Sequence, residues 1–399
     1  MYTREPTIDL KNTMKPLLLF ALISVLTACG GGGGGDGPAA PVPAPPASTE
    51  TPPAIQTSTV NWSLSRVSPA EADTTVNAVE AILDHVFGDA AVQSAMLVKD
   101  GYIVGERYAE GIDASTLGTS WSVAKSYYSA AVGIAVDEGW INSLDQPASD
   151  FFTEWEGTNK SDITVRDLLE MRSGLPASSR IFFAADQTAF SLDLDKTRPE
   201  GGTFVYSNPT SQLFEPLLLR STGLDAHSYL RQKLLSPIGI DVDQIGMWRD
   251  AVGNPVTYFG LDLSPEDMAR FGLLYARGGE WDGTQVVSES YVTASISAQS
   301  EFYGFQWWLM NEAYFNAAVP IQVAAALGLD GQKIYVWPEG DVVLVVFTRY
   351  DHNANVGYTL SPTNFPSTCA GRNSCNDSDV SVPSFSQYNL MFLLQELLD

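Results

Sequence analysis

The sequence predicts a mixed α/β (α+β) fold in which an antiparallel sheet, flanked by helices, is interrupted by an inserted all-helical subdomain. Two observations predict it. β-rich segments occur early in the folded region, at 94–98 and 102–108, and again late, at 334–337 and 342–347. The segments between them carry helical patterns, so the sheet is expected to form from both ends of the folded domain, which we place at 60–399.

The first elements follow from hydrophobic spacing and turn residues. Apolar residues at helical spacing predict a helix over 71–87, and two β-rich runs around Asp100-Gly101 predict a hairpin. A further helical pattern runs from Val123 to Glu138. Its small residues allow close burial, so this helix is expected to lie centrally; they are Ala124, Ala130, Ala131, Gly133 and Ala135.

The middle of the chain supplies the helical subdomain, which we place at about 140–260. Its first helix is expected over 163–171 and ends at Ser173-Gly174. The two late strands flank the turn residues of 338–341. Further helices are expected at 211–221, 227–235, 264–276 and 387–398.

Charge and composition exclude several functional classes. The chain of 399 residues has a formal net charge of −25 and no basic cluster, which argues against binding to nucleic acid or to anionic lipid surfaces. Its three histidines are far apart, and neither a Cys-x-x-Cys pair nor a His-Glu-x-x-His run occurs. We therefore expect no metal site and no cofactor.

The N-terminal segment has the pattern of an export signal. Met14-Lys15 is followed by a short apolar run and by small residues before Cys29, which predicts a signal peptide over 1–28 with Met14 as the start. The segment ending in Cys29 resembles the lipobox of bacterial lipoproteins. That resemblance implies cleavage before Cys29 and acylation of its thiol; a plain secretory signal is the alternative.

The residues after Cys29 predict a tether and a location. A Gly-rich and Pro-rich stretch over 29–59 has too few apolar residues to pack a core. Gly30, rather than Asp, follows the cysteine, which favours the outer membrane of the cell envelope over retention in the inner membrane. In an oxidising compartment the two other cysteines, Cys369 and Cys375, are expected to form a local disulfide.

Two short motifs carry the predicted chemistry. In Ser122-Val123-Ala124-Lys125, a helix that begins at Ser122 places Lys125 on the same face one turn later. The hydroxyl is then a nucleophile beside a base, and the helix N-terminus supplies backbone N–H groups for an oxyanion. In Tyr206-Ser207-Asn208, Tyr206 is a candidate proton shuttle with Lys125, and Asn208 a candidate to hold Lys125 and a substrate carbonyl.

Together the two motifs resemble those of the serine β-lactamase and penicillin-binding superfamily. The resemblance extends over about 90–399 and is strongest to the branch of class C β-lactamases, carboxylesterases and 6-aminohexanoate-dimer hydrolases. It includes Asp167-Leu168-Leu169 and Tyr303-Gly304-Phe305-Gln306-Trp307-Trp308. It implies a β-lactamase/transpeptidase-like fold with the site between the sheet region and the helical subdomain. Trp307 and Trp308 either pack in the core or line an apolar acyl pocket.

The third motif of this superfamily is altered. Penicillin-handling members carry Lys-Thr-Gly, or a histidine in the lysine place, but here Leu329-Asp330-Gly331-Gln332 stands in that position. Substrates with a carboxylate should therefore bind poorly, unless Arg349 or another cation replaces the missing one. By the same resemblance, a backbone N–H near Gly331 or Gln332 is the second oxyanion donor, beside that of Ser122.

The sequence thus predicts a lipid-anchored serine hydrolase that cleaves a small ester or linear amide through a Ser122 acyl-enzyme, with Lys125 and Tyr206 as the base. One alternative is a D-amino-acid peptidase or β-lactamase that acts on cell-wall peptide or β-lactams. Another is a non-catalytic binding lipoprotein. No Gly-x-Ser-x-Gly elbow is present, so an α/β-hydrolase triad has no candidate serine. Oligomeric state is not predicted.

Overall fold

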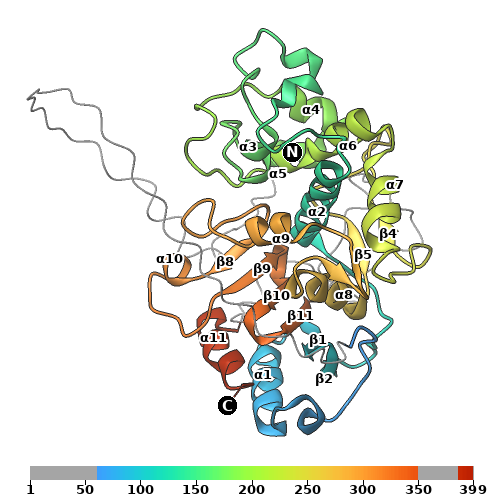
Figure 1. Cartoon of the computed structure of the whole chain (residues 1–399), viewed down its shortest axis with the longest axis vertical. Coiled ribbons are helices and arrows are strands. Elements are labelled where there is room, and N and C mark those ends of the chain that lie inside the picture. Colours follow the sequence, from blue (N-terminus) through green and yellow to red (C-terminus); the bar gives the residue numbers. More distant parts are fainter. Residues whose placement is uncertain (1–60, 349–384, 399) are drawn as a thin grey trace, which may run out of the picture. The chain divides into compact units, whose positions relative to one another are not determined.

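The computed structural model describes residues 61–348 and 385–398. Its largest sheet has six strands in the order β2-β1-β11-β10-β9-β8, and every neighbouring pair is antiparallel (Figure 1). In this sheet β1 (Val92–Lys99) lies between β2 (Tyr102–Tyr108) and the late strand β11 (Val342–Thr348). The predicted fold class, with early and late strands in one antiparallel sheet, is confirmed.

The sequence patterns missed several strands. β9 (Val323–Leu327) is rich in alanine and β8 (Trp308–Met310) is short, so neither shows a β-rich pattern, whereas β10 (Lys333–Trp337) matches its prediction. A second sheet has the order β3-β5-β4. The strands of this second sheet are β3 (Gly118–Thr119), β4 (Gly246–Met247) and β5 (Leu261–Leu263). A separate hairpin consists of β6 (Glu280–Trp281) and β7 (Thr284–Gln285).

Helices pack against the strands of the large sheet, whose inner strands are buried. Gly272 of α8 (Pro265–Ala276) fits against Val343 of β11, and a Cβ at this position would overlap the valine side chain. Gly105 of β2 likewise fits against α1 (Val76–Phe87), which also contacts α11 (Gln387–Gln395). All seven residues of β11 are buried, so this strand reads as a continuous apolar run.

The helical part of the chain is more finely divided than its pattern suggests. The helix predicted over 211–221 is two helices, α5 and α6, and the one predicted over 227–235 is α7 followed by a π-helical turn, Arg231–Leu235. The remaining helices are α3 (Val165–Leu169), α4 (Gln187–Asp193), α5 (Asn208–Gln212), α6 (Phe214–Thr222), α7 (Ala226–Leu230), α9 (Glu289–Ser295) and α10 (Glu312–Phe315).

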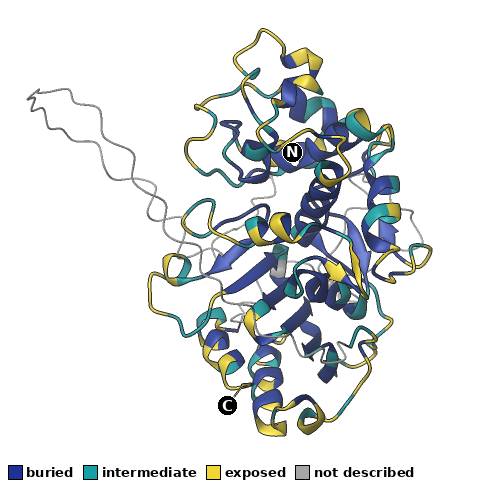
Figure 2. Ribbon diagram, viewed as in Figure 1, coloured by how far each residue is buried: buried dark blue, intermediate teal, exposed yellow. Residues whose placement is uncertain are grey.

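Helix α2 (Ala124–Asp137) is the central helix that its small residues predict. Its first twelve residues are all buried (Figure 2), and it contacts α6 and α7. The helix is preceded by a 3-10 turn, Trp121–Val123. Gly133 lies against the ring of Tyr291, whose hydroxyl donates to the Ser129 carbonyl at 2.7 Å. A residue without a side chain is needed there because the tyrosine is fixed.

A buried histidine joins α2 to the helices beside it. His227 of α7 donates from Nε2 to the Trp248 carbonyl at 2.8 Å, so its Nδ1 accepts from the Tyr128 hydroxyl at 2.7 Å. The ring is therefore neutral, and burial lowers the pKa of His227 to about 3. This contact holds α7 and the segment after β4 against the helix that carries Lys125.

Several predicted features lie outside the described residues. They are the signal segment, Cys29 and the linker, Arg349, and the Cys369–Cys375 pair. Within residues 61–348 and 385–398, no helix has the length and apolar character needed to cross a membrane.

Replacement of Gly133 tests the tight packing of α2. We expect Gly133→Ala to lower the free energy of unfolding by about 1–3 kcal/mol, because the new methyl group overlaps the Tyr291 ring. Urea unfolding followed by circular dichroism measures the change. If the overlap with the ring is the cause, Tyr291→Leu should lower the free energy of unfolding less in the Gly133→Ala variant than in the wild type. An unchanged unfolding midpoint for Gly133→Ala would contradict the prediction.

The neutral His227 predicts a loss of stability in acid. An unfolded histidine has a pKa of about 6.5, so between pH 6.5 and 3 the unfolded state binds the extra proton. The contribution of neutral His227 to the free energy of unfolding is fully present above pH 6.5. It is lost as the pH falls from 6.5 toward 3, by about 1.4 kcal/mol per pH unit. The urea concentration at the unfolding midpoint should be measured at several pH values for the wild type and for His227→Gln. We expect the difference between the two midpoints to become smaller as the pH falls. A gap that is independent of pH would refute the assignment.

Candidate active site

Ser122 and Lys125 lie together, as their spacing predicts. Ser122 is in the 3-10 turn before α2, and Lys125 is in the first turn of the helix. The Lys125 Nζ lies 2.7 Å from the Ser122 Oγ and donates to the Tyr258 carbonyl at 2.8 Å. Lys125 is only 1% exposed, and burial lowers its pKa well below the usual value. The amine is therefore suited to accept the proton of the serine hydroxyl.

The turn before Ser122 is held in an unfavourable conformation. Trp121 has φ 45°, in the left-handed region that non-glycine residues rarely adopt. Ser120 fixes one side of the turn through two hydrogen bonds with Leu261 of β5, at 2.7 and 3.2 Å. The Trp121 ring stacks on Phe259, with ring centroids 5.2 Å apart. These contacts hold Ser122 at the start of the helix.

Tyr206 faces the same lysine. Its ring centroid lies 5.1 Å from the Lys125 Nζ, and Trp308 of β8 packs against the ring with centroids 5.3 Å apart. Burial raises the pKa of Tyr206 to about 12, and the Ser122 side chain acts in the opposite direction. The phenol is thus protonated at neutral pH, with the serine hydroxyl beside it.

Asn208 takes a different place from the one expected. It is the first residue of α5, and its Oδ1 is buried with no hydrogen-bond partner in the described part of the chain. No hydrogen bond joins it to Lys125 among these residues; the Tyr258 carbonyl takes that role instead. Sequence reasoning missed Tyr258 because a backbone carbonyl leaves no signal in residue type.

The altered third motif lies beside the nucleophile. A side chain at Gly328 would come within 2.5 Å of the Ser120 carbonyl, so the end of β9 closely approaches the turn that carries Ser122. Gly331 has φ 112°, which only glycine readily adopts. The Gln332 side chain accepts from the Thr348 backbone N–H at 3.1 Å and donates to the Thr348 hydroxyl. Its side chain is therefore engaged with β11, which leaves its backbone N–H as the candidate donor.

An apolar contact occupies the place of the missing cation. Leu329 packs against the aromatic cluster that includes Trp121 and Phe259. Lys333 is near in sequence, but its ammonium donates to the Gly331 carbonyl at 3.1 Å and lies 4.6 Å from the Phe385 ring centroid.

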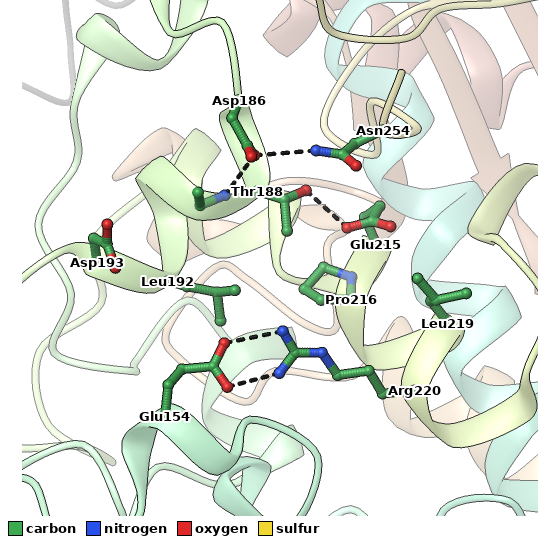
Figure 3. A pocket seen from close by; sticks show the side chains of 11 residues that line it. Glu154, Asp186, Thr188, Leu192, Asp193, Glu215, Pro216, Leu219, Arg220 and Asn254 are labelled. Carbon is green, nitrogen blue, oxygen red and sulfur yellow. Dashed lines mark hydrogen bonds and ion pairs between the residues drawn. The ribbon is translucent and has the colours of Figure 1, made fainter. Parts of the chain in front are cut away.

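A separate polar pocket lies in the helical region (Figure 3). It has a volume of about 430 Å³ and contains neither Ser122 nor Lys125 among its lining residues. Glu215 accepts from the Thr188 hydroxyl at 2.7 Å, and burial raises its pKa to about 7. The ion pair Arg220–Glu154 forms one side. In the residues that the structure describes, no group of His, Cys, Asp and Glu side chains is arranged to hold a metal ion.

Solved structures share this fold. A protein of Bacillus anthracis assigned as a 6-aminohexanoate-dimer hydrolase is 21% identical, with 68% of this chain and 76% of that chain covered and a TM-score of 0.57. An octameric penicillin-binding protein homologue from Pyrococcus abyssi is 20% identical, covering 68% and 73%, with a TM-score of 0.54. A protein of Bacteroides dorei assigned as a β-lactamase is 16% identical, with 82% of this chain and 99% of that chain covered and a TM-score of 0.61. At these identities the likeness shows the fold alone.

Sequence comparison identifies the family. No curated protein sequence matches the chain. The family model described as Beta-lactamase matches residues 79–360, which include Ser122, Lys125 and Tyr206 and make up more than half of the chain. The resemblance to the β-lactamase and penicillin-binding superfamily is thereby confirmed, and this chain belongs to the Beta-lactamase family.

Proposed function

We propose that this chain is a serine hydrolase that cleaves an uncharged ester or linear amide through an acyl-enzyme on Ser122. The observation that carries the proposal is the buried Lys125 amine, 2.7 Å from the Ser122 hydroxyl. A neutral lysine is a competent base, and burial with no acidic partner in the described residues lowers the pKa of Lys125 and so favours the neutral amine. A protein that only binds has no need of so costly an arrangement, which argues against the non-catalytic alternative.

The geometry supports a two-step reaction. Ser122 Oγ attacks the carbonyl carbon while its proton passes to Lys125 Nζ. As the C–O or C–N bond breaks, the Tyr206 hydroxyl gives its proton to the leaving group and receives the one held by Lys125. Water then attacks the acyl-enzyme, the same two side chains take its proton, and Ser122 recovers its hydroxyl. Backbone N–H groups of Ser122 and Gln332 are the proposed oxyanion donors.

The resting state of Tyr206 refines the proposed proton path. A phenol with a pKa of about 12 is protonated at neutral pH, so Lys125 rather than a resting phenolate is the base for Ser122. The proposed role of Tyr206 is then to relay a proton to the leaving group. Asn208, with an unpartnered buried Oδ1 in the described residues, is available to a substrate N–H or through its amide nitrogen to a carbonyl.

An uncharged substrate is favoured by the apolar surroundings of Ser122. Leu329 and the aromatic cluster around Trp121 offer no counterion for a carboxylate. The amide bond, though not the charge, matches the substrate in the name of the Bacillus anthracis neighbour, because a linear 6-aminohexanoate dimer ends in an ammonium and a carboxylate. The penicillin-binding homologues among the neighbours keep the D-amino-acid peptidase or β-lactamase activity as the alternative.

The proposed location is the cell envelope. The apolar run that follows Met14-Lys15 and ends at Cys29 supports export and lipid anchoring. The Gly-rich and Pro-rich linker then gives the hydrolase domain reach from the membrane.

Loss of the proposed catalytic groups should abolish or strongly reduce activity. We expect Ser122→Ala to eliminate hydrolysis of a short p-nitrophenyl ester, and Lys125→Ala or Tyr206→Phe to reduce kcat/KM by at least about 100-fold. Intact-mass spectrometry after fluorophosphonate treatment should show one adduct on wild type and none on Ser122→Ala. Circular dichroism controls for folding. Normal turnover in Ser122→Ala would show that the assignment is wrong.

Penicillin labelling separates the main proposal from its enzymatic alternative. We expect no stable penicillin adduct under conditions that give complete fluorophosphonate labelling, because Leu329 supplies no positive charge for the carboxylate. Leu329→Lys should raise the labelling rate at least about tenfold, whereas the uncharged control Leu329→Met should not. A stable wild-type adduct at Ser122 would instead support a penicillin-binding activity, and hydrolysis of the penicillin would support a β-lactamase activity.

A further inference from the structure

Gln306 is a buried polar residue outside the proposed catalytic set. It is 2% exposed and lies in the segment between α9 and β8. Its φ of 63° is in the left-handed region, which glycine adopts freely and a residue with a Cβ does not. The backbone at this position would suit glycine, so the presence of a long amide side chain needs an explanation from its contacts.

One set of contacts reaches the helix that carries Ser122 and Lys125. The Gln306 backbone carbonyl accepts a hydrogen bond from the Ser126 hydroxyl at 2.8 Å, and Ser126 directly follows Lys125 in α2. One turn later, the Ser129 hydroxyl donates to the carbonyl of Phe305 at 2.9 Å. Two serines on one face of α2 therefore fix this segment to the helix.

The amide of Gln306 reaches two other helices. Its Nε2 donates to the Leu168 and Leu169 carbonyls at 3.1 and 2.7 Å. These are the last carbonyls of α3, and the final carbonyls of a helix lack partners within the helix. Its Oε1 accepts from the Ser211 hydroxyl of α5 at 2.8 Å. Both amide N–H groups and the amide oxygen are thus engaged.

The end of α3 in turn holds Tyr206. Two residues beyond the helix, Met171 has φ 58°, and its carbonyl accepts from the Val205 N–H at 2.8 Å. The Met171 sulfur accepts from the Ser207 N–H at 3.3 Å. These two bonds flank Tyr206 on either side. A hydrogen-bonded path therefore runs from α2 through Gln306 and α3 to the backbone of Tyr206.

We propose that Gln306 is a positioning residue for the acyl transfer: by joining α2 to α3 and α5, it sets the distance between the Ser122–Lys125 pair and the Tyr206 hydroxyl. The inference rests on the proposed function. A purely structural role would change the fraction of folded protein, whereas a positioning role changes the rate constant of each folded site. Small displacements of reacting groups reduce rates by about 10- to 100-fold.

The test removes the amide bonds while keeping the length of the side chain. In Gln306→Met we expect kcat for a p-nitrophenyl ester to fall at least about tenfold, with KM within about twofold of wild type. The rate constant of fluorophosphonate labelling per folded site should fall in parallel, while the final stoichiometry remains one adduct on Ser122. The matched control is Gln285→Met, which removes amide bonds to the Gly278 and Val287 carbonyls, at 2.8 and 2.6 Å, from the β6–β7 hairpin. It should retain wild-type rates.

A milder variant keeps the test decisive if Gln306→Met does not fold. Ser211→Ala removes only the contact with α5, and we expect kcat to fall about threefold or more with folding intact. Wild-type labelling rates in the folded variant would overturn the inference and leave the proposed function standing. Failure of the wild-type protein to label at Ser122 would instead refute the proposed function, so the two failures are distinguishable.

Discussion

Burial of the Lys125 amine is the constraint on which the proposed site depends. An ammonium group in the protein interior loses its hydration, and a nearby carboxylate would restore its charge and remove its basicity. The fold avoids this outcome even though the chain has a net charge of −25. Within residues 61–348 and 385–398, the amine contacts a hydroxyl, a carbonyl and two aromatic rings. Helix α2, buried over its first twelve residues, keeps solvent away, and the segment before β5 supplies the carbonyl of Tyr258.

How much of this was predictable depends on whether the cause is local in sequence. The hairpin around Asp100-Gly101 and the small residues of α2 are local patterns, and the structure follows them. The Ser122–Lys125 contact follows from helical spacing. In contrast, the alanines of β9 have no strand preference of their own. This segment is a strand because it pairs with β8 and β10, and such pairing is not visible in the local sequence. The Tyr258 carbonyl and the amide of Gln306 act across the fold, and only tertiary structure reveals such contacts.

The altered third motif shows how one fold can serve different chemistry. Gly328 lets the end of β9 approach Ser120, and Gly331 adopts a left-handed φ beside Thr348, while Leu329 joins an aromatic cluster. The family thus accounts for the backbone frame around Ser122, and we propose that the side chain at 329 selects the charge that a substrate can carry. Neighbours of 16–21% identity share the frame, so they are informative about the fold and not about the occupant of the site.

The pairing of β1 with β11 has a consequence for how the protein is made. β1 ends at Lys99 and β11 begins at Val342, so each hydrogen bond between them closes a loop that contains Ser122, Lys125, Tyr206 and Gln306. Such non-local contacts form late, because the entropy of closing the loop is lost before the contacts are gained. A partial chain that lacks β11 leaves both β1 and β10 without their shared partner. The sheet, and with it the frame of the site, can therefore close only once the chain as far as Thr348 is available for pairing.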